Sequence, residues 1–148
     1  MSIQAVSVQD QIIASLEIAA EKCGDISPAV YERYFEKSPG SEELMVQIDH
    51  LVRGKMLDEI MRLLMTEDYS MEDEYLTFEM KTHEEAYSVI KSMYGSLLHS
   101  VWEILREGIG GEWTDGFEYA WDKRIQALEL AIENHSPSHQ IMLGESNE

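Results

Sequence analysis

The chain has 148 residues, 44% of them hydrophobic, and its 29 acidic and 11 basic side chains give a net charge of −18. A chain of this length supports one domain with one core. So acidic a surface repels phosphate backbones and anionic lipid, which argues against nucleic-acid and membrane partners. The single Cys23 excludes an internal disulfide framework. Because no basic leader and no long apolar run is present, we expect a cytoplasmic protein.

Apolar residues recur at helical spacing along most of the chain, and no segment sustains the alternation of a strand. The expected helices cover, in chain order, residues 8–23, 27–38, 41–45, 47–65, 74–85, 90–107 and 114–134. Their unequal lengths, without an internal repeat, argue against a symmetric bundle. The sequence therefore predicts an all-α domain of about seven helices over residues 1–135, followed by a polar, disordered tail over residues 136–148.

Local signals predict several helix boundaries. Ser27 is expected to cap the second helix, and Pro39-Gly40 to end it. The run from Gly108 to Gly111 is expected to break the sixth helix. Gly54 lies inside the fourth helix, where glycine destabilises the helix by about 1 kcal/mol relative to alanine. A glycine at such a position predicts a close neighbour on that side of the helix.

Two helices carry a clear apolar stripe. In the fourth helix it comprises Ile48, Leu51, Val52, Met56, Leu57, Ile60, Met61 and Leu64. In the last helix, which Thr114 is expected to cap, it comprises Phe117, Trp121, Ile125, Leu128 and Ile132. We expect both stripes to face the core.

Three short motifs occur in a specific order and spacing. They are Tyr-Glu-Arg-Tyr-Phe-Glu-Lys-Ser-Pro at 31–39, Tyr-Ser-Val at 87–89 followed by Met-Tyr at 93–94, and Gly-Glu-Trp-Thr-Asp-Gly-Phe-Glu-Tyr-Ala-Trp at 111–121. Together they resemble the second helix, the corner after the haem-binding histidine and the junction before the last helix in bacterial and sensor-type globins. The resemblance covers residues 10–134 and implies a globin-like fold.

The resemblance also implies a b-type haem between the helix over 47–65 and the segment that contains His83. His83 would be the proximal iron ligand, and a backbone carbonyl about a turn earlier is expected to fix its tautomer. Arg53 or Val52 falls at the family's distal position, and Leu57 at the aliphatic position over the haem. Other residues expected to line the pocket are Met45, where the family has a Phe, Met61 and Val89.

The residues alone leave alternatives open. A single histidine beside Glu84 and Glu85 also reads as a polar residue at a helix end, because one histidine is not by itself a metal site. Arg53 either donates to a bound ligand or a haem propionate, or is a surface arginine paired with acids. His50 is a candidate sixth iron ligand or a solvent-facing residue.

Two functions follow from this reading. The first is a haem protein that binds a diatomic gas (O₂, NO or CO) for sensing, storage or scavenging. The second is a haem-free globin-like module that signals through a protein partner. No phosphate loop, nucleophile motif, reductase or output domain is present in the sequence, so we expect turnover or signalling to need a separate partner or a homodimer.

Overall fold

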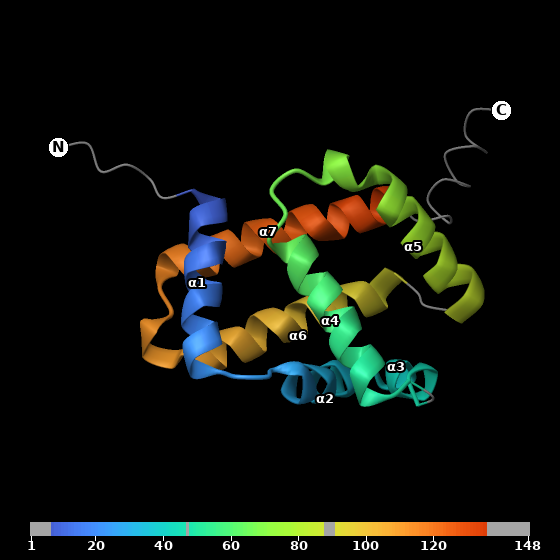
Figure 1. Ribbon diagram of the computed structural model, residues 1–148, viewed down its shortest axis with the longest axis horizontal. Helices are drawn as coiled ribbons and strands as arrows, with labels where there is room; N and C mark the ends of the chain where they lie inside the picture. Colours follow the sequence, from blue (N-terminus) through green and yellow to red (C-terminus); the bar gives the residue numbers. More distant parts are fainter. Residues whose placement is uncertain (1–6, 47, 88–90, 136–148) are drawn as a thin grey trace.

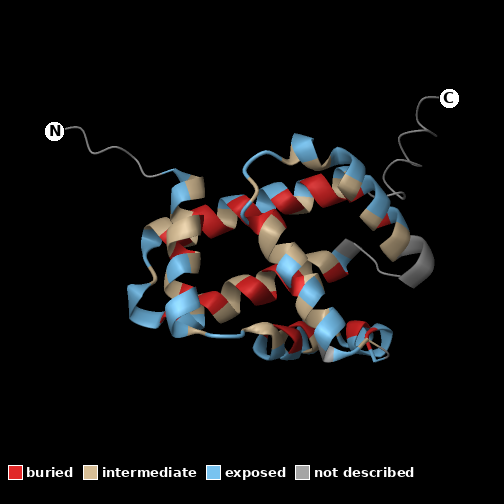
Figure 2. Ribbon diagram, in the orientation of Figure 1, coloured by how far each residue is buried: buried red, intermediate tan, exposed pale blue. Residues whose placement is uncertain are grey.

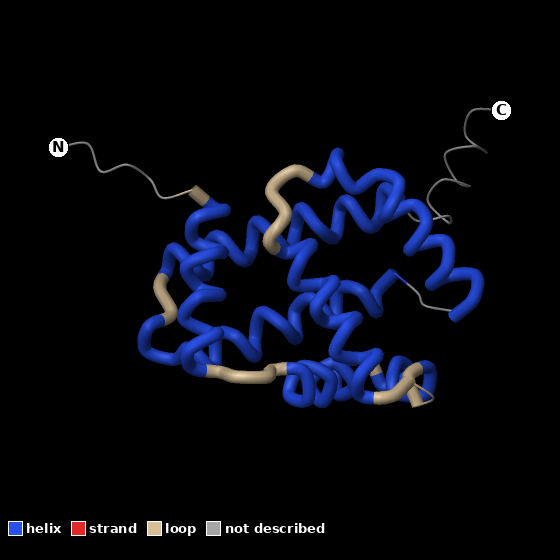
Figure 3. Tube along the Cα trace, in the orientation of Figure 1, coloured by secondary structure: helices blue, strands red, loops and turns tan. Residues whose placement is uncertain are grey.

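The computed structural model describes residues 7–46, 48–87 and 91–135, except the side chains of His50, Lys91 and residues 84–87. Its elements are α1 (Val8–Lys22), α2 (Ser27–Lys37), α3 (Pro39–Leu44), α4 (His50–Leu64), the 3₁₀ turn η1 (Tyr69–Glu72), α5 (Asp73–Tyr87), α6 (Lys91–Ile109), the 3₁₀ turn η2 (Gly110–Glu112) and α7 (Asp115–His135). Over these ranges the chain contains no strand (Figure 3). The predicted all-α fold of about seven helices is confirmed. The predicted tail over 136–148 lies outside the described residues.

Helices α6 and α7 form the centre of the fold, and the other helices pack around them (Figure 1). α1 lies across both of them, and α2 packs along α6. α4 contacts α2 and α7, and α5 packs on α7. Within the described ranges, α4 and α5 are not a closely packed pair. α7 is therefore the common support for the two helices that were expected to flank a haem.

The buried side chains gather on the inward faces of α6 and α7 (Figure 2). All five residues of the stripe predicted for the last helix are buried, so that prediction is confirmed. Thr114 caps this helix as predicted, because its Oγ1 accepts from the backbone N–H of Phe117 at 3.0 Å. Trp121 is fully buried, and its Nε1–H donates to Ser15 Oγ of α1 at 2.9 Å. The helix that closes the chain is thus tied to the first helix by both packing and a buried hydrogen bond.

A buried arginine joins α7 to the end of α4. Arg124 donates through Nη1 to the backbone oxygen of Leu64 and through Nη2 to Gln9 Oε1 at 2.7 Å. Gln9 in turn donates to the backbone oxygen of Met65 at 2.8 Å. Burial lowers the pKa of Arg124 below its usual value. The side chain supplies donors to carbonyls that the end of a helix leaves without partners.

Several helix boundaries differ from the prediction. Ser27 lies inside α2, where its backbone N–H donates to Asp25 Oδ1 at 2.9 Å, so the aspartate replaces it as the local acceptor. Pro39 opens α3, because proline suits the first position of a helix. Gly108 stays helical, and α6 ends only before Gly110, whose φ is +64°.

Two glycines have opposite surroundings. A Cβ on Gly108 would lie 2.6 Å from Cys23 Sγ, so α1 and α6 approach too closely there for a side chain. A Cβ on Gly54 would meet no heavy atom within 4 Å, so the predicted close neighbour is wrong. Gly54 instead lines an open groove of about 440 Å³ between α2 and α4.

The stripe predicted on the fourth helix is only partly buried. Leu51 is 69% exposed and Val52 is 44% exposed, and full burial begins at Leu57. The periodicity of a helix shows which residues share a face. It does not show where along the helix that face meets the rest of the protein.

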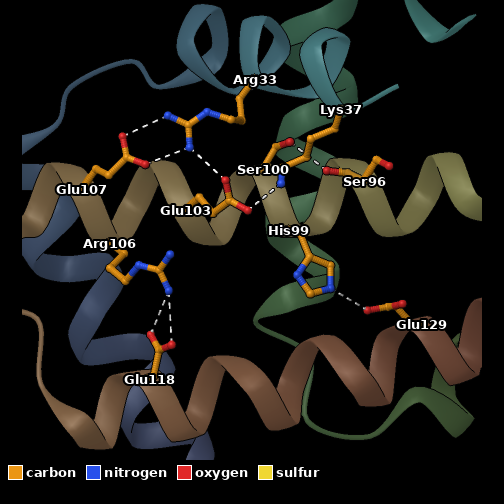
Figure 4. A network of polar contacts seen from close by, with 10 residues as sticks. All are labelled: Arg33, Lys37, Ser96, His99, Ser100, Glu103, Arg106, Glu107, Glu118 and Glu129. Atoms are coloured by element: carbon orange, nitrogen blue, oxygen red, sulfur yellow. Dashed lines mark hydrogen bonds and ion pairs between the residues drawn. The ribbon is translucent and has the colours of Figure 1, made fainter. Parts of the chain in front are cut away.

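A network of charges connects α2 to α6 (Figure 4). Arg33 binds Glu107 with both terminal nitrogens, at 2.8 and 3.0 Å, and reaches Glu103 at 2.9 Å. Lys37 pairs with Glu103 at 2.7 Å. Burial alone would raise the pKa of Glu103, but the hydrogen bonds from Lys37 and Arg33 lower it below 4.5. The hydrogen bonds from Arg33 also lower the pKa of Glu107.

This network predicts a specific acid sensitivity. Because both folded-state pKa values lie below the usual 4.5, the stabilisation is present above that pH and is lost as the pH falls through the lowered values. The free energy of unfolding should therefore decrease as the pH falls from about 5 to about 3, and less so in Arg33→Gln. Urea melts across this range measure it, with the exposed Lys55→Gln as a control. Equal slopes in Arg33→Gln and wild type would contradict the assignment.

Candidate functional site

His83 lies on α5, in the last turns of the helix, with a side chain that is 28% exposed. Its Nδ1 is 3.1 Å from the hydroxyl of Tyr94 on α6, and the two ring centroids are 6.0 Å apart. Its Nε2 is 3.7 Å from Glu79 Oε2 on its own helix. The imidazole thus has a polar group near each ring nitrogen.

The position of His83 follows from the packing of α5. Asp73 and Glu74 favour the start of this helix, because acidic side chains complement its N-terminal dipole. Leu76 and Met80 are buried four residues apart and define the face that packs on the body. His83 follows Met80 by three residues, so it lies at the edge of this buried face. The helix therefore holds the imidazole half in the protein and half in solvent.

Burial determines the charge of His83. It lowers the pKa of the imidazole below its usual 6.5, and the Glu79 carboxylate raises that pKa by a smaller amount. His83 is therefore neutral near pH 7, which is the form that binds metals. The Tyr94 hydroxyl can accept from Nδ1–H or donate to a bare Nδ1, so this contact fits either neutral tautomer. Only the tautomer with hydrogen on Nδ1 leaves the lone pair on Nε2. The tautomer control expected from a backbone carbonyl stays a prediction.

The Arg53 side chain points toward the connection between α3 and α4. Its Nε donates to the backbone oxygen of Ile48 at 3.1 Å, and its Nη2 to that of Met45 at 2.9 Å. Its Cζ lies 5.2 Å from the ring centroid of Phe35 and 5.8 Å from that of Tyr31. No carboxylate of the described residues forms an ion pair with it. Arg53 thus holds the α3–α4 connection against α2, and its expected role toward a bound ligand or a haem propionate stays a prediction.

The other predicted pocket residues have different environments. Met45 and Leu57 are buried, and Met61 packs half-buried against the core. Val52 is exposed. Val89 lies outside the described residues, as does the side chain of His50. The structure therefore brings His83 together with Tyr94 and Glu79, and Arg53 together with Met45.

Two features of the site could have been found in the sequence. Glu79 precedes His83 by four residues, which places both on one face of a helix. Tyr94 belongs to a motif that the resemblance used, although only the angle between α5 and α6 brings its hydroxyl to His83. By contrast, no group of three or more His, Cys, Asp or Glu residues suited to a metal ion occurs in the described part of the chain. Such groups form multi-ligand metal sites, whereas haem iron needs one axial side chain.

Comparison with known proteins adds no family. No protein-family model matches the chain, and no curated protein matches it. None of the described helices is long and apolar enough to cross a bilayer. The functional reading therefore rests on the geometry around His83 and on the three sequence motifs.

Proposed function

We propose that the chain is a globin-like haem protein that binds a diatomic gas (O₂, NO or CO) for sensing, storage or scavenging. The observation that carries the proposal is the imidazole of His83. Burial favours its neutral form, its Nδ1 is 3.1 Å from the Tyr94 hydroxyl on the next helix, and the resemblance implies that it is the proximal ligand. Any turnover would need a separate reductase.

The residues expected to hold such a group have a suitable chemistry. Leu57 of α4 and Met80 of α5 belong to the hydrophobic core and Met61 of α4 packs against it, and apolar side chains suit a cofactor site of this kind. These two helices share α7 as a support without packing closely on each other within the described ranges. Tyr94 would orient the imidazole as a second partner of the ligand. When bound, haem iron supplies the position at which the gas binds.

The second candidate function is a haem-free module that acts through a protein partner. The observation in its favour is an apolar surface around the α3–α4 corner, where four large hydrophobic side chains are exposed: Leu44, Val46, Leu51 and Val52. Exposed apolar side chains that form one patch are typical of interaction sites. Arg53 also favours it, because its Nε and Nη2 already donate to backbone carbonyls on the side where a distal donor was expected.

A haem titration of the purified full chain separates the two. We expect saturation at one haem per chain, with a sharp Soret band that shifts when CO is added to the reduced protein. Cys23→Ser serves as a control against thiolate ligation, because Cys23 is the only cysteine. A broad band that rises without saturation would contradict haem binding and favour the partner-binding module.

A further inference from the structure

Glu79 lies beside the nitrogen of His83 that would bind iron. Its Oε2 is 3.7 Å from Nε2, whereas Nδ1 faces the Tyr94 hydroxyl. Glu79 is 32% exposed, so its carboxylate is in partial contact with water. Because it precedes His83 by four residues, the two side chains share one face of α5.

We propose that Glu79 is a positioning residue that competes with haem for the Nε2 side of His83. Haem uptake then requires this carboxylate to rotate into solvent, and the strength of haem binding depends on Glu79 as well as on His83. This inference rests on the proposed function, since it concerns the same imidazole.

Two physical effects give Glu79 this role. A flat porphyrin that approaches Nε2 would meet the carboxylate on the same helix face, and burying an unpaired carboxylate is costly. The negative charge also favours the tautomer with hydrogen on Nε2, which leaves no lone pair there for iron. At 3.7 Å the contact is longer than a hydrogen bond, so the carboxylate is held weakly and can leave. The predicted effect is therefore moderate.

The test measures the haem affinity of the full chain at equilibrium, by competition with a haem-scavenging protein of known affinity. Glu79→Ala should bind haem roughly three- to tenfold more tightly than wild type, in line with the modest energy of exposed charge contacts. Glu79→Gln should behave similarly, because it removes the charge and keeps the shape. Glu74→Gln is the matched control, since it removes an exposed acid from the first turn of the same helix and should leave the affinity unchanged.

The outcomes distinguish this inference from the proposed function. If wild type binds haem through His83 and the Glu79 variants bind it with the wild-type affinity or more weakly, the inference is wrong and the function stands. If wild type takes up no haem but Glu79→Ala does, the inference is supported. If neither takes up haem, both are wrong.

A haem-free measurement provides an independent check. Nitrogen-15 NMR of the histidine ring should show hydrogen mainly on Nε2 of His83 in wild type. In Glu79→Ala the population with hydrogen on Nδ1 should rise. An unchanged tautomer in a variant with wild-type circular dichroism would contradict the role given to the carboxylate.

Discussion

Replacing Trp121 by Ala should destabilise the protein by about 3–5 kcal/mol. Trp121 is fully buried between α7 and the rest of the core, so its removal leaves a cavity that neighbours fill only in part. The change also removes the donor that satisfies Ser15 Oγ, a hydroxyl that is itself fully buried. Urea denaturation followed by circular dichroism measures the loss.

The neighbouring Tyr119 provides a matched control. It is an exposed aromatic residue on the same helix, so Tyr119→Ala should change the free energy of unfolding by less than about 0.5 kcal/mol. Ser15→Ala isolates the hydrogen bond and should cost about 1–3 kcal/mol, because it leaves the buried indole N–H of Trp121 unpaired. A loss well under about 1 kcal/mol in Trp121→Ala would mean that this face of α7 is not core.

Replacing Arg124 by Ala should cost about 2–4 kcal/mol, because it leaves a buried carbonyl without its charged donor and removes a packed aliphatic stem. The carbonyl belongs to Leu64, which is fully buried at the end of α4. Gln9 loses a partner in the same change. The melting temperature and the urea midpoint should both fall.

Two further variants separate the parts of this effect. Lys123→Ala changes an exposed charge next in sequence and should be nearly neutral. Arg124→Met keeps much of the apolar stem but no donor, so it should recover only the packing part of the loss. Full recovery of stability in Arg124→Met would contradict a role for the hydrogen bond to Leu64.

The fold was largely predictable because apolar residues recur at helical spacing in amphipathic helices. The stripe of α7 around Trp121 and Leu128 predicted both the helix and its buried face. Arg124 lies on the same helix face, between those two residues. Its position therefore predicted burial, although a charged residue type usually indicates exposure. The errors at Gly54 and Leu51 have one cause. The surroundings of both residues depend on how far the neighbouring helices extend along α4. The spacing of apolar residues within α4 does not predict this.

The site was less predictable than the fold. Spacing and motif order selected His83, and its local helix placed Glu79 on the same face. The contact between His83 and Tyr94 depends on the angle at which α5 and α6 meet. The spacing of residues within one helix does not predict that angle. Arg53 was expected to face acids or a ligand, and its guanidinium donates to backbone carbonyls five and eight residues earlier, in the turn before α4. Such turn geometry follows from the folded chain alone.

Imidazole rescue of His83→Gly tests the central claim most directly. The glycine variant should lose the wild-type iron spectrum, and added imidazole should restore the Soret band, because a free imidazole can fill the space of the missing side chain and bind iron. If His83→Gly binds haem with an unchanged iron spectrum, His83 is not the ligand, and the proposal that this imidazole holds the iron is wrong.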